Sequence, residues 1–209
     1  MRSILAPLFF VTACVSAPPD QSSAPTTVRD RLARPTRLTV SAAASSGTIT
    51  ARRYTHDGWQ VADVAVPIAN GELVATASAA GELELATLIV DAAPIDIPPS
   101  VFGTPAQLRD VVLVLAAKPA VTTTWTDADD ATATAMVDLD LMWTLFVNGG
   151  ATPLGTQHLP PIAVDLALAG SGDHVDASID LHATGELWSW AGLIQLADLK
   201  LTLVASTEP

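Results

Sequence analysis

Apolar and polar residues alternate along most of the chain after Pro35, as they do in β-strands that bury one face. Turn signals divide the alternating segments, most clearly Asp57-Gly58 and Asn70-Gly71, which favour tight hairpins. No segment of useful length shows the helical spacing of apolar residues. The pattern predicts strands at 37–42, 48–54, 59–66, 73–78, 82–91, 110–117, 121–126, 132–147, 162–168, 175–183 and 193–204.

The segment 132–147 is the longest expected strand. Its odd-numbered positions are apolar, whereas Met136, Met142 and Phe146 interrupt the otherwise polar even-numbered face. At about 3.3 Å per residue a single strand of this length would extend about 50 Å, which is longer than most strands in globular proteins. We therefore expect it to bend, to carry a bulge or to serve two layers.

About ten strands joined mainly by hairpins predict an all-β fold, in which an antiparallel sheet forms a sandwich or a partly open barrel. Residues 92–109 interrupt the alternation with several prolines. Within them, Thr104 and Pro105 suit the cap and first position of a helix, and Gln107 suits a capping box. The sequence thus predicts at most one short helical turn, ending at Arg109.

The first residues have the layout of a secretory signal. One positive charge at Arg2 precedes the apolar run 4–11, which is shorter than the about 20 residues needed to span a bilayer. The run closes on Val11-Thr12-Ala13-Cys14, which resembles the bacterial lipobox, an aliphatic residue and two small residues before a cysteine. The resemblance covers residues 1–14 and identifies the chain as similar to bacterial lipoproteins.

The resemblance implies cleavage before Cys14 and acylation of its sulfur and amine, so that the membrane would be bound through an N-terminal lipid. Each buried methylene of such a lipid adds about 0.8 kcal/mol to membrane affinity. No Asp follows the cysteine directly, which resembles lipoproteins sorted to the outer membrane. The alternative is an ordinary signal peptide cut elsewhere, for example at Ala17, which would discard Cys14.

These features predict three regions. Residues 1–13 are the expected signal peptide, residues 14–34 a lipidated cysteine with a flexible tether, and residues 35–209 a single β-rich domain. The tether is expected because this stretch is rich in Pro, Ser, Thr and Ala and has almost nothing large to bury. Cys14 is the only cysteine of the chain, so no disulfide is expected.

Charge is scarce and unevenly distributed. Charged residues make up 15% of the 209 residues, and the net charge is -12. After residue 53 the only cations are Arg109, Lys118 and Lys200, so the body is acidic and would be repelled by nucleic acid. An arginine cluster at residues 29–53 either contacts anionic lipid headgroups near the anchor or simply balances the acids of the body.

Candidate chemistry is sparse. The loop with Asp127, Asp129 and Asp130 could hold Ca²⁺, but it lacks the glycine and distal glutamate of an EF-hand and is equally an acidic turn. The histidines have no zinc-ligand spacing, and the chain has no nucleophile elbow and no phosphate-binding glycine loop. We therefore expect no metal, no cofactor and no catalytic residues. The histidines are His56, His158, His174 and His182.

Two aromatic or apolar sets are candidate ligand contacts. Trp188 and Trp190 are two residues apart and could project together into headgroups, onto a sugar or onto a lipid chain. Met136, Met142 and Phe146 could line an apolar groove, or they could belong to a second core layer.

These observations favour a non-catalytic lipoprotein of the cell envelope, tethered to the membrane, that acts as a binding or structural module for a protein, glycan or lipid. The alternative is a periplasmic lipid carrier or chaperone that would use the apolar groove. A third hypothesis is an enzyme that uses the aspartate loops.

Overall fold

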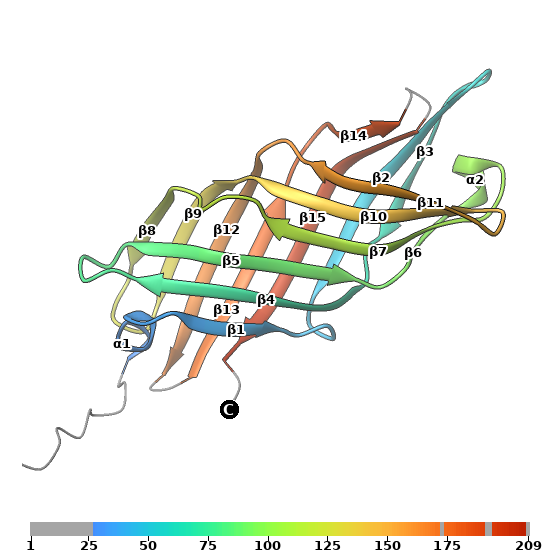
Figure 1. Ribbon diagram of the computed structural model, residues 1–209. Coiled ribbons are helices and arrows are strands. Elements are labelled where there is room, and N and C mark those ends of the chain that lie inside the picture. Colours follow the sequence, from blue (N-terminus) through green and yellow to red (C-terminus); the bar gives the residue numbers. More distant parts are fainter. Residues whose placement is uncertain (1–26, 172–173, 191–193, 208–209) are drawn as a thin grey trace, which may run out of the picture.

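The computed structural model describes residues 27–171, 174–190 and 194–207. These residues form an antiparallel sheet of fifteen strands, curled into a half-barrel, together with two short helices (Figure 1). The prediction of an all-β antiparallel fold is confirmed, and the sheet has more strands than the sequence pattern indicated.

The elements follow one another without long connections. The first part of the chain contains α1 (Val28–Leu32), β1 (Thr36–Val40), β2 (Ser46–Thr55), β3 (Gly58–Ala65), β4 (Ile68–Ala77), β5 (Leu83–Ala92), β6 (Ile95–Ile97), α2 (Pro99–Phe102) and β7 (Ala106–Leu115). The rest contains β8 (Val121–Trp125), β9 (Ala131–Val137), β10 (Leu139–Val147), β11 (Gly150–His158), β12 (Ile162–Ser171), β13 (His174–His182), β14 (Glu186–Trp190) and β15 (Ile194–Ser206).

The main path of the sheet runs β11-β10-β7-β5-β4-β1-β15-β13-β12-β9-β8. β1 connects its two halves, because it pairs with β4 on one side and with β15 on the other. In Figure 1 the strands β4, β5, β7 and β10 lie in front of β9, β12, β13 and β15 and cross them steeply. The curl thus produces two layers, and the β2–β3 hairpin extends the rear layer from β15.

Side chains from the inward face of the strands fill the space between the layers. On β13, Ile179 and Leu181 are buried and the intervening Asp180 is exposed, which is the alternation expected of a half-buried strand. Leu73 of β4 and Leu88 of β5 are buried from the facing layer. Burying a side chain of this size stabilises the folded state by about 1.5–3 kcal/mol. Packing between the layers is therefore a main source of stability.

The helix α1 shows that the last part of the predicted tether belongs to the folded body. Val28 and Leu32 lie one helical turn apart, and both are fully buried. Thr27 caps the helix, because its hydroxyl accepts a hydrogen bond from the backbone N–H of Asp30 at 3.1 Å. Residues 28–32, which the sequence assigns to the tether, are thus helical and packed on the body: two apolar residues on one helical face are enough to dock this segment, although its overall composition is that of a tether.

The expected long strand 132–147 is two strands. It is interrupted at Asp138, whose carbonyl accepts a hydrogen bond from the backbone N–H of Ala116 at 2.9 Å. β9 pairs with β12 and β8, whereas β10 pairs with β7 and β11. Of the three expected solutions, the segment adopts the one in which it serves two layers.

The expected helical turn ending at Arg109 is also wrong. Residues 106–115 form β7, because Ala106 and Leu108 are buried in alternation and the strand pairs with both β6 and β10. The helical turn of this region is α2, with Pro99 at its start and Gly103 in the left-handed conformation at its end (φ 75°). Strand pairing overrides the local capping signal of residues 104–107.

Candidate functional site

The end of the body at α1 is closed by hydrogen bonds that involve the aspartate loop. The backbone N–H of Val28 donates to Oδ1 of Asp129 at 2.9 Å. Oδ1 of Asp127 accepts hydrogen bonds from the backbone N–H groups of Asp129 and Asp130 at 2.8 and 2.9 Å. Two of the three carboxylates considered for Ca²⁺ thus satisfy a helix start and a turn. Within the described residues, no group of three or more His, Cys, Asp or Glu is placed to hold a metal ion.

Arg29 and Trp125 fix the same end. The indole Nε1 of Trp125 donates to the carbonyl of Gly81 at 2.6 Å, and the guanidinium of Arg29 lies 5.6 Å from the centre of the indole ring. The backbone N–H of Arg29 donates to the carbonyl of Ala128 at 3.0 Å. This member of the arginine cluster therefore contacts the body through its side chain as well as its backbone.

The histidines lie on the surface beside carboxylates rather than in a shared site. Each of three histidines has one acidic neighbour and is exposed. The pairs are His158 with Asp140 at 2.9 Å, His174 with Asp176 at 3.1 Å and His182 with Asp165 at 3.8 Å.

The structure does not bring Met136, Met142 and Phe146 together. Met142 and Phe146 emerge from the outer face of β10, where Met142 is 38% exposed and Phe146 is half-buried. Met136 is 58% exposed on β9, which is separated from β10 by most of the sheet. These three side chains therefore do not line one groove.

The other candidate residues are Trp188, Trp190 and Cys14. Trp188 on β14 is half-buried, and its ring packs edge-on against that of Trp143 with the centroids 4.5 Å apart. Trp190 lies two residues further along the same strand, but its side chain is outside the described part. Cys14 and the other residues that resemble a lipobox lie outside the described residues.

An apolar cavity of about 40 Å³ lies between the layers next to Trp143 and Trp188. Trp143 is 4% exposed, and its Nε1 has no hydrogen-bond partner among the described residues. Ligand pockets typically have volumes of about 300–1,000 Å³. The cavity is therefore far smaller than a site for an acyl chain.

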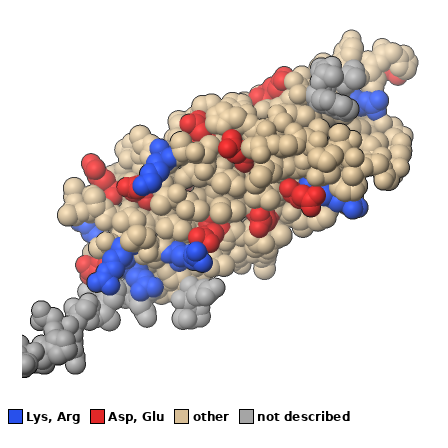
Figure 2. Space-filling model, in the orientation of Figure 1, with Lys and Arg blue, Asp and Glu red and all other residues tan. Residues whose placement is uncertain are grey.

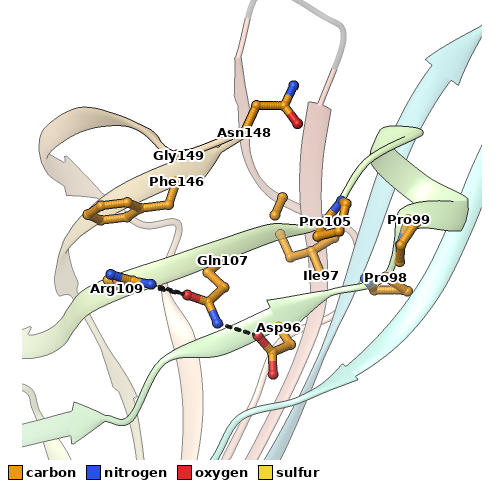
Figure 3. A pocket seen from close by; sticks show the side chains of 11 residues that line it. Asp96, Ile97, Pro98, Pro99, Pro105, Gln107, Arg109, Phe146, Asn148 and Gly149 are labelled. Carbon is orange, nitrogen blue, oxygen red and sulfur yellow. Dashed lines mark hydrogen bonds between the residues drawn. The ribbon is translucent and has the colours of Figure 1, made fainter.

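A larger pocket, of about 450 Å³, lies on the outer face of the sheet where β6 and β10 end and β7 begins. Pro98 and Pro99 at the start of α2 form one wall, and the turn at Asn148 and Gly149 lies opposite (Figure 3). The side chains of Thr104 and Asn148 are joined by a hydrogen bond. This bond links the loop between α2 and β7 to the turn between β10 and β11. The pocket volume is in the range typical of small-molecule sites.

Arg109 is the cation of this pocket and is held by a neutral partner. Its Nε and Nη2 both donate to Oε1 of Gln107, at 2.8 and 2.5 Å, and Nε2 of Gln107 donates to Oδ1 of Asp96 at 2.6 Å (Figure 3). The guanidinium carbon lies 4.2 Å from the centre of the Phe146 ring. Within the described residues, no carboxylate forms an ion pair with Arg109.

A bulge in β7 adjoins this arginine. The register with β10 shifts between Met142 and Thr144, and the adjacent residues Arg109 and Asp110 are both exposed, which breaks the alternation of the strand. Asp110 has a φ of 53°, a left-handed conformation that is uncommon outside glycine. Bulges of this kind often adjoin functional sites, where they re-aim a side chain.

Among the residues that line the pocket, Asp96 and Arg109 are charged. Figure 2 shows a face that is mostly uncharged, on which several basic side chains gather at the lower left and acidic side chains are spread elsewhere. Lys118 pairs with Glu84 and Arg52 with Asp198, so these cations are matched by carboxylates in the usual way. Arg109 instead contacts an amide oxygen and an aromatic ring, and Arg29 and Arg53 likewise contact carbonyl oxygens and aromatic rings.

The β2–β3 hairpin carries the other exposed apolar residues at this end. Tyr54 and Trp59 are paired across the hairpin with their rings 5.3 Å apart, and they are 54% and 46% exposed. Val61, on the same face, is 54% exposed. In Figure 1 the tip of this hairpin and α2 lie at the end of the body away from α1. The open surfaces are thus concentrated away from the point where the chain enters the fold.

Two features of the sequence mark this site without identifying it. Arg109 is one of few cations in the acidic body, and residues 92–109 are a proline-rich interruption of the strand pattern. Assigning Gln107 and Arg109 to a helical turn concealed that they stand on one face of a strand, two residues apart.

Comparisons with protein-family models, curated proteins and solved structures found no match. The two helices of the described part are short, and neither is long and apolar enough to cross a membrane.

Proposed function

We propose that the protein is a lipid-anchored module of a bacterial cell envelope, attached to the outer membrane, which acts by binding a partner rather than by catalysis. In this proposal Cys14 carries the lipid and a short tether leads to α1. The partner binds at the opposite end of the body, where the outer-face pocket lies.

The observation that carries the proposal is that α1 and α2 lie at opposite ends of the body (Figure 1), and that Pro99 of α2 lines the pocket. An anchored binding protein benefits from this arrangement, because its binding end then faces away from the membrane that holds it. The 13 or so residues between Cys14 and α1 could extend about 3.3 Å each, which gives the body room above the membrane.

The hydrogen bonds at the two ends support the same assignment of an anchored end at α1 and a binding end at the pocket. Around α1 the aspartate loop donates and accepts hydrogen bonds within the fold, which favours a structural role for those carboxylates. In the pocket, by contrast, Arg109 has N–H groups that no neighbour in the described part of the chain accepts.

The anchor is tested by labelling cells that produce the full chain with radioactive palmitate. We expect label on the wild-type protein and recovery in the outer-membrane fraction, and we expect Cys14→Ser to lose both. Since Cys14 is the only cysteine, no other thiol can account for the label. Release of an unlabelled wild-type protein into the periplasm would show an ordinary signal peptide and refute the proposal.

The carrier alternative makes a different prediction. A carrier would need the layers to separate around a lipid, because the cavity between them has only about 40 Å³ and the methionines lie outside. Native mass spectrometry of the full chain with Cys14→Ser, purified without detergent, distinguishes the two functions. An adduct with the mass of a whole phospholipid supports the carrier, whereas the bare chain mass, or that of the chain with one small acid, supports the binding module.

A further inference from the structure

We propose that the outer-face pocket binds a carboxylate carried on an apolar group, with Arg109 as its anion-binding residue. The ligand could be the C-terminal end of a peptide with an apolar last residue or a free apolar acid, and both present the same chemistry. The inference rests on the binding role proposed above and names the class of ligand.

Three of the five N–H groups of Arg109 have no acceptor among the described residues. Arginine has five N–H donors, and Oε1 of Gln107 accepts one from Nε and one from Nη2. Both N–H groups of Nη1 and the second N–H of Nη2 remain. These two nitrogens form the end of the guanidinium fork, which matches the two oxygens of a carboxylate.

The orientation of this guanidinium is fixed before a ligand binds. Gln107 holds the Nε edge of the guanidinium and is itself held by Asp96, while the ring of Phe146 lies against the guanidinium face at 4.2 Å. Gln107 and Phe146 are register partners on β7 and β10, so the two contacts come from directly opposed residues. A preorganised cation loses little entropy when it binds an anion.

Charge limits the ligand to one negative charge. Arg109 pairs with no carboxylate among the described residues, as is also true of Arg29 and Arg53, which contact carbonyl oxygens and aromatic rings. Arg109 supplies a single positive charge, and the nearby Asp96 disfavours any further negative charge. A phosphate dianion would be only partly neutralised at this site.

The pocket also has an apolar wall. Ile97, Pro98, Pro99 and Pro105 line the side of the pocket across from Phe146 and Arg109, and they provide no charged group (Figure 3). A ligand with its carboxylate at Arg109 would therefore meet an apolar surface where its hydrocarbon part crosses the pocket. This combination favours an apolar acid over a small hydrophilic anion such as acetate.

The test is isothermal titration of the full chain carrying Cys14→Ser, which keeps the lipid out of the measurement. The probes are N-acetyl-phenylalanine, its uncharged amide, octanoate and inorganic phosphate. We expect N-acetyl-phenylalanine or octanoate to bind, with the amide at least about tenfold weaker because it cannot form charge-assisted hydrogen bonds. Binding of N-acetyl-phenylalanine alone would indicate a peptide end, and binding of octanoate alone a fatty acid.

Variants assign the binding to this pocket. Arg109→Met retains the length of the side chain without its charge and should weaken the acid by at least about tenfold. Lys200→Met is the matched control, since it removes an exposed cation on β15 and should change affinity by less than about twofold. Gln107→Leu tests the positioning role: it should weaken the acid and reduce the preference for acid over amide, whereas Arg109→Lys should not restore wild-type affinity.

Three results would overturn the inference: no binding of either acid by the wild type, equal binding of acid and amide, or unchanged binding by a folded Arg109→Met variant. Tighter binding of phosphate than of both acids would also overturn it. None of these outcomes depends on lipidation, so a failure here would leave the palmitate test of the anchor unaffected, and the reverse also holds.

Discussion

The two ends of the body use their polar groups in opposite ways. At the α1 end, the carboxylate of Asp129 accepts a backbone hydrogen bond from Val28, and the indole of Trp125 donates to the carbonyl of Gly81. At the α2 end, Arg109 has only a neutral hydrogen-bond acceptor, and Tyr54 stays exposed on a projecting hairpin. The same fold is therefore closed at one end and open at the other.

This difference separates the polar groups that stabilise the fold from those that are available to a ligand. Polar groups whose partners lie within the fold contribute to folding, because removing one partner leaves the other unsatisfied. Groups that face an open pocket contribute little to folding and remain available for a ligand. Substitutions of similar size should thus have unequal costs at the two ends.

The largest effect should follow removal of α1. A chain trimmed to 35–209 lacks the buried side chains of Val28 and Leu32, and each contributes about 1.5–3 kcal/mol. We expect its free energy of unfolding in urea to be lower by at least about 3 kcal/mol than that of a chain trimmed to 27–209. Equal stability of the two chains would show that α1 is part of the tether after all.

A smaller loss is expected for Asp129→Ala, because the backbone N–H of Val28 loses its acceptor. The expected cost is about 1–2 kcal/mol in urea unfolding. Asp130→Ala is the control, since Asp130 contributes its backbone groups to the loop, and it should cost less than about 0.5 kcal/mol. If the two variants are equally stable, the closed end does not depend on this carboxylate.

At the open end, Arg109→Met should cost less than about 1 kcal/mol, which is the contribution of an exposed contact between a cation and an aromatic ring. Thermal unfolding and circular dichroism measure it. A loss of several kcal/mol would mean that Arg109 is a structural residue and that the contrast between the ends does not hold.

The smallest effect should be that of Val61→Thr on the projecting hairpin. Val61 is 54% exposed, and threonine retains the branched shape that suits a strand, so the change should stay within about 0.5 kcal/mol. A larger loss in urea unfolding would indicate that this face is covered in the folded protein.

The sequence predicted local structure better than long-range arrangement. The alternation around Ile179 and Leu181 specifies a strand with one buried face, whatever its neighbours are. The pairing of β1 with β15 joins distant parts of the chain, and no local pattern encodes it. Two buried residues, Val28 and Leu32, were too few to change the apparent composition of the tether.

The candidate site was less predictable than the fold. Met142 and Phe146 were correctly placed on one face of a strand, but Met136 was grouped with them because the break at Asp138 cannot be recognised from alternation alone. Arg109 acquires its setting from Phe146, which is brought beside it only by the pairing of β7 with β10. The site therefore depends on tertiary contacts that the sequence pattern does not encode.

Native-state hydrogen exchange of the full chain tests the contrast between the ends most directly. The N–H groups of Val28 and Arg29 begin a helix and would be without partners in an isolated one, but here Asp129 and Ala128 accept their hydrogen bonds. We predict strong protection of both amides and fast exchange at Asp57, in the exposed hairpin turn. Exchange of Val28 and Arg29 at the rate of an unfolded chain would show that these hydrogen bonds do not persist and that the α1 end is not closed.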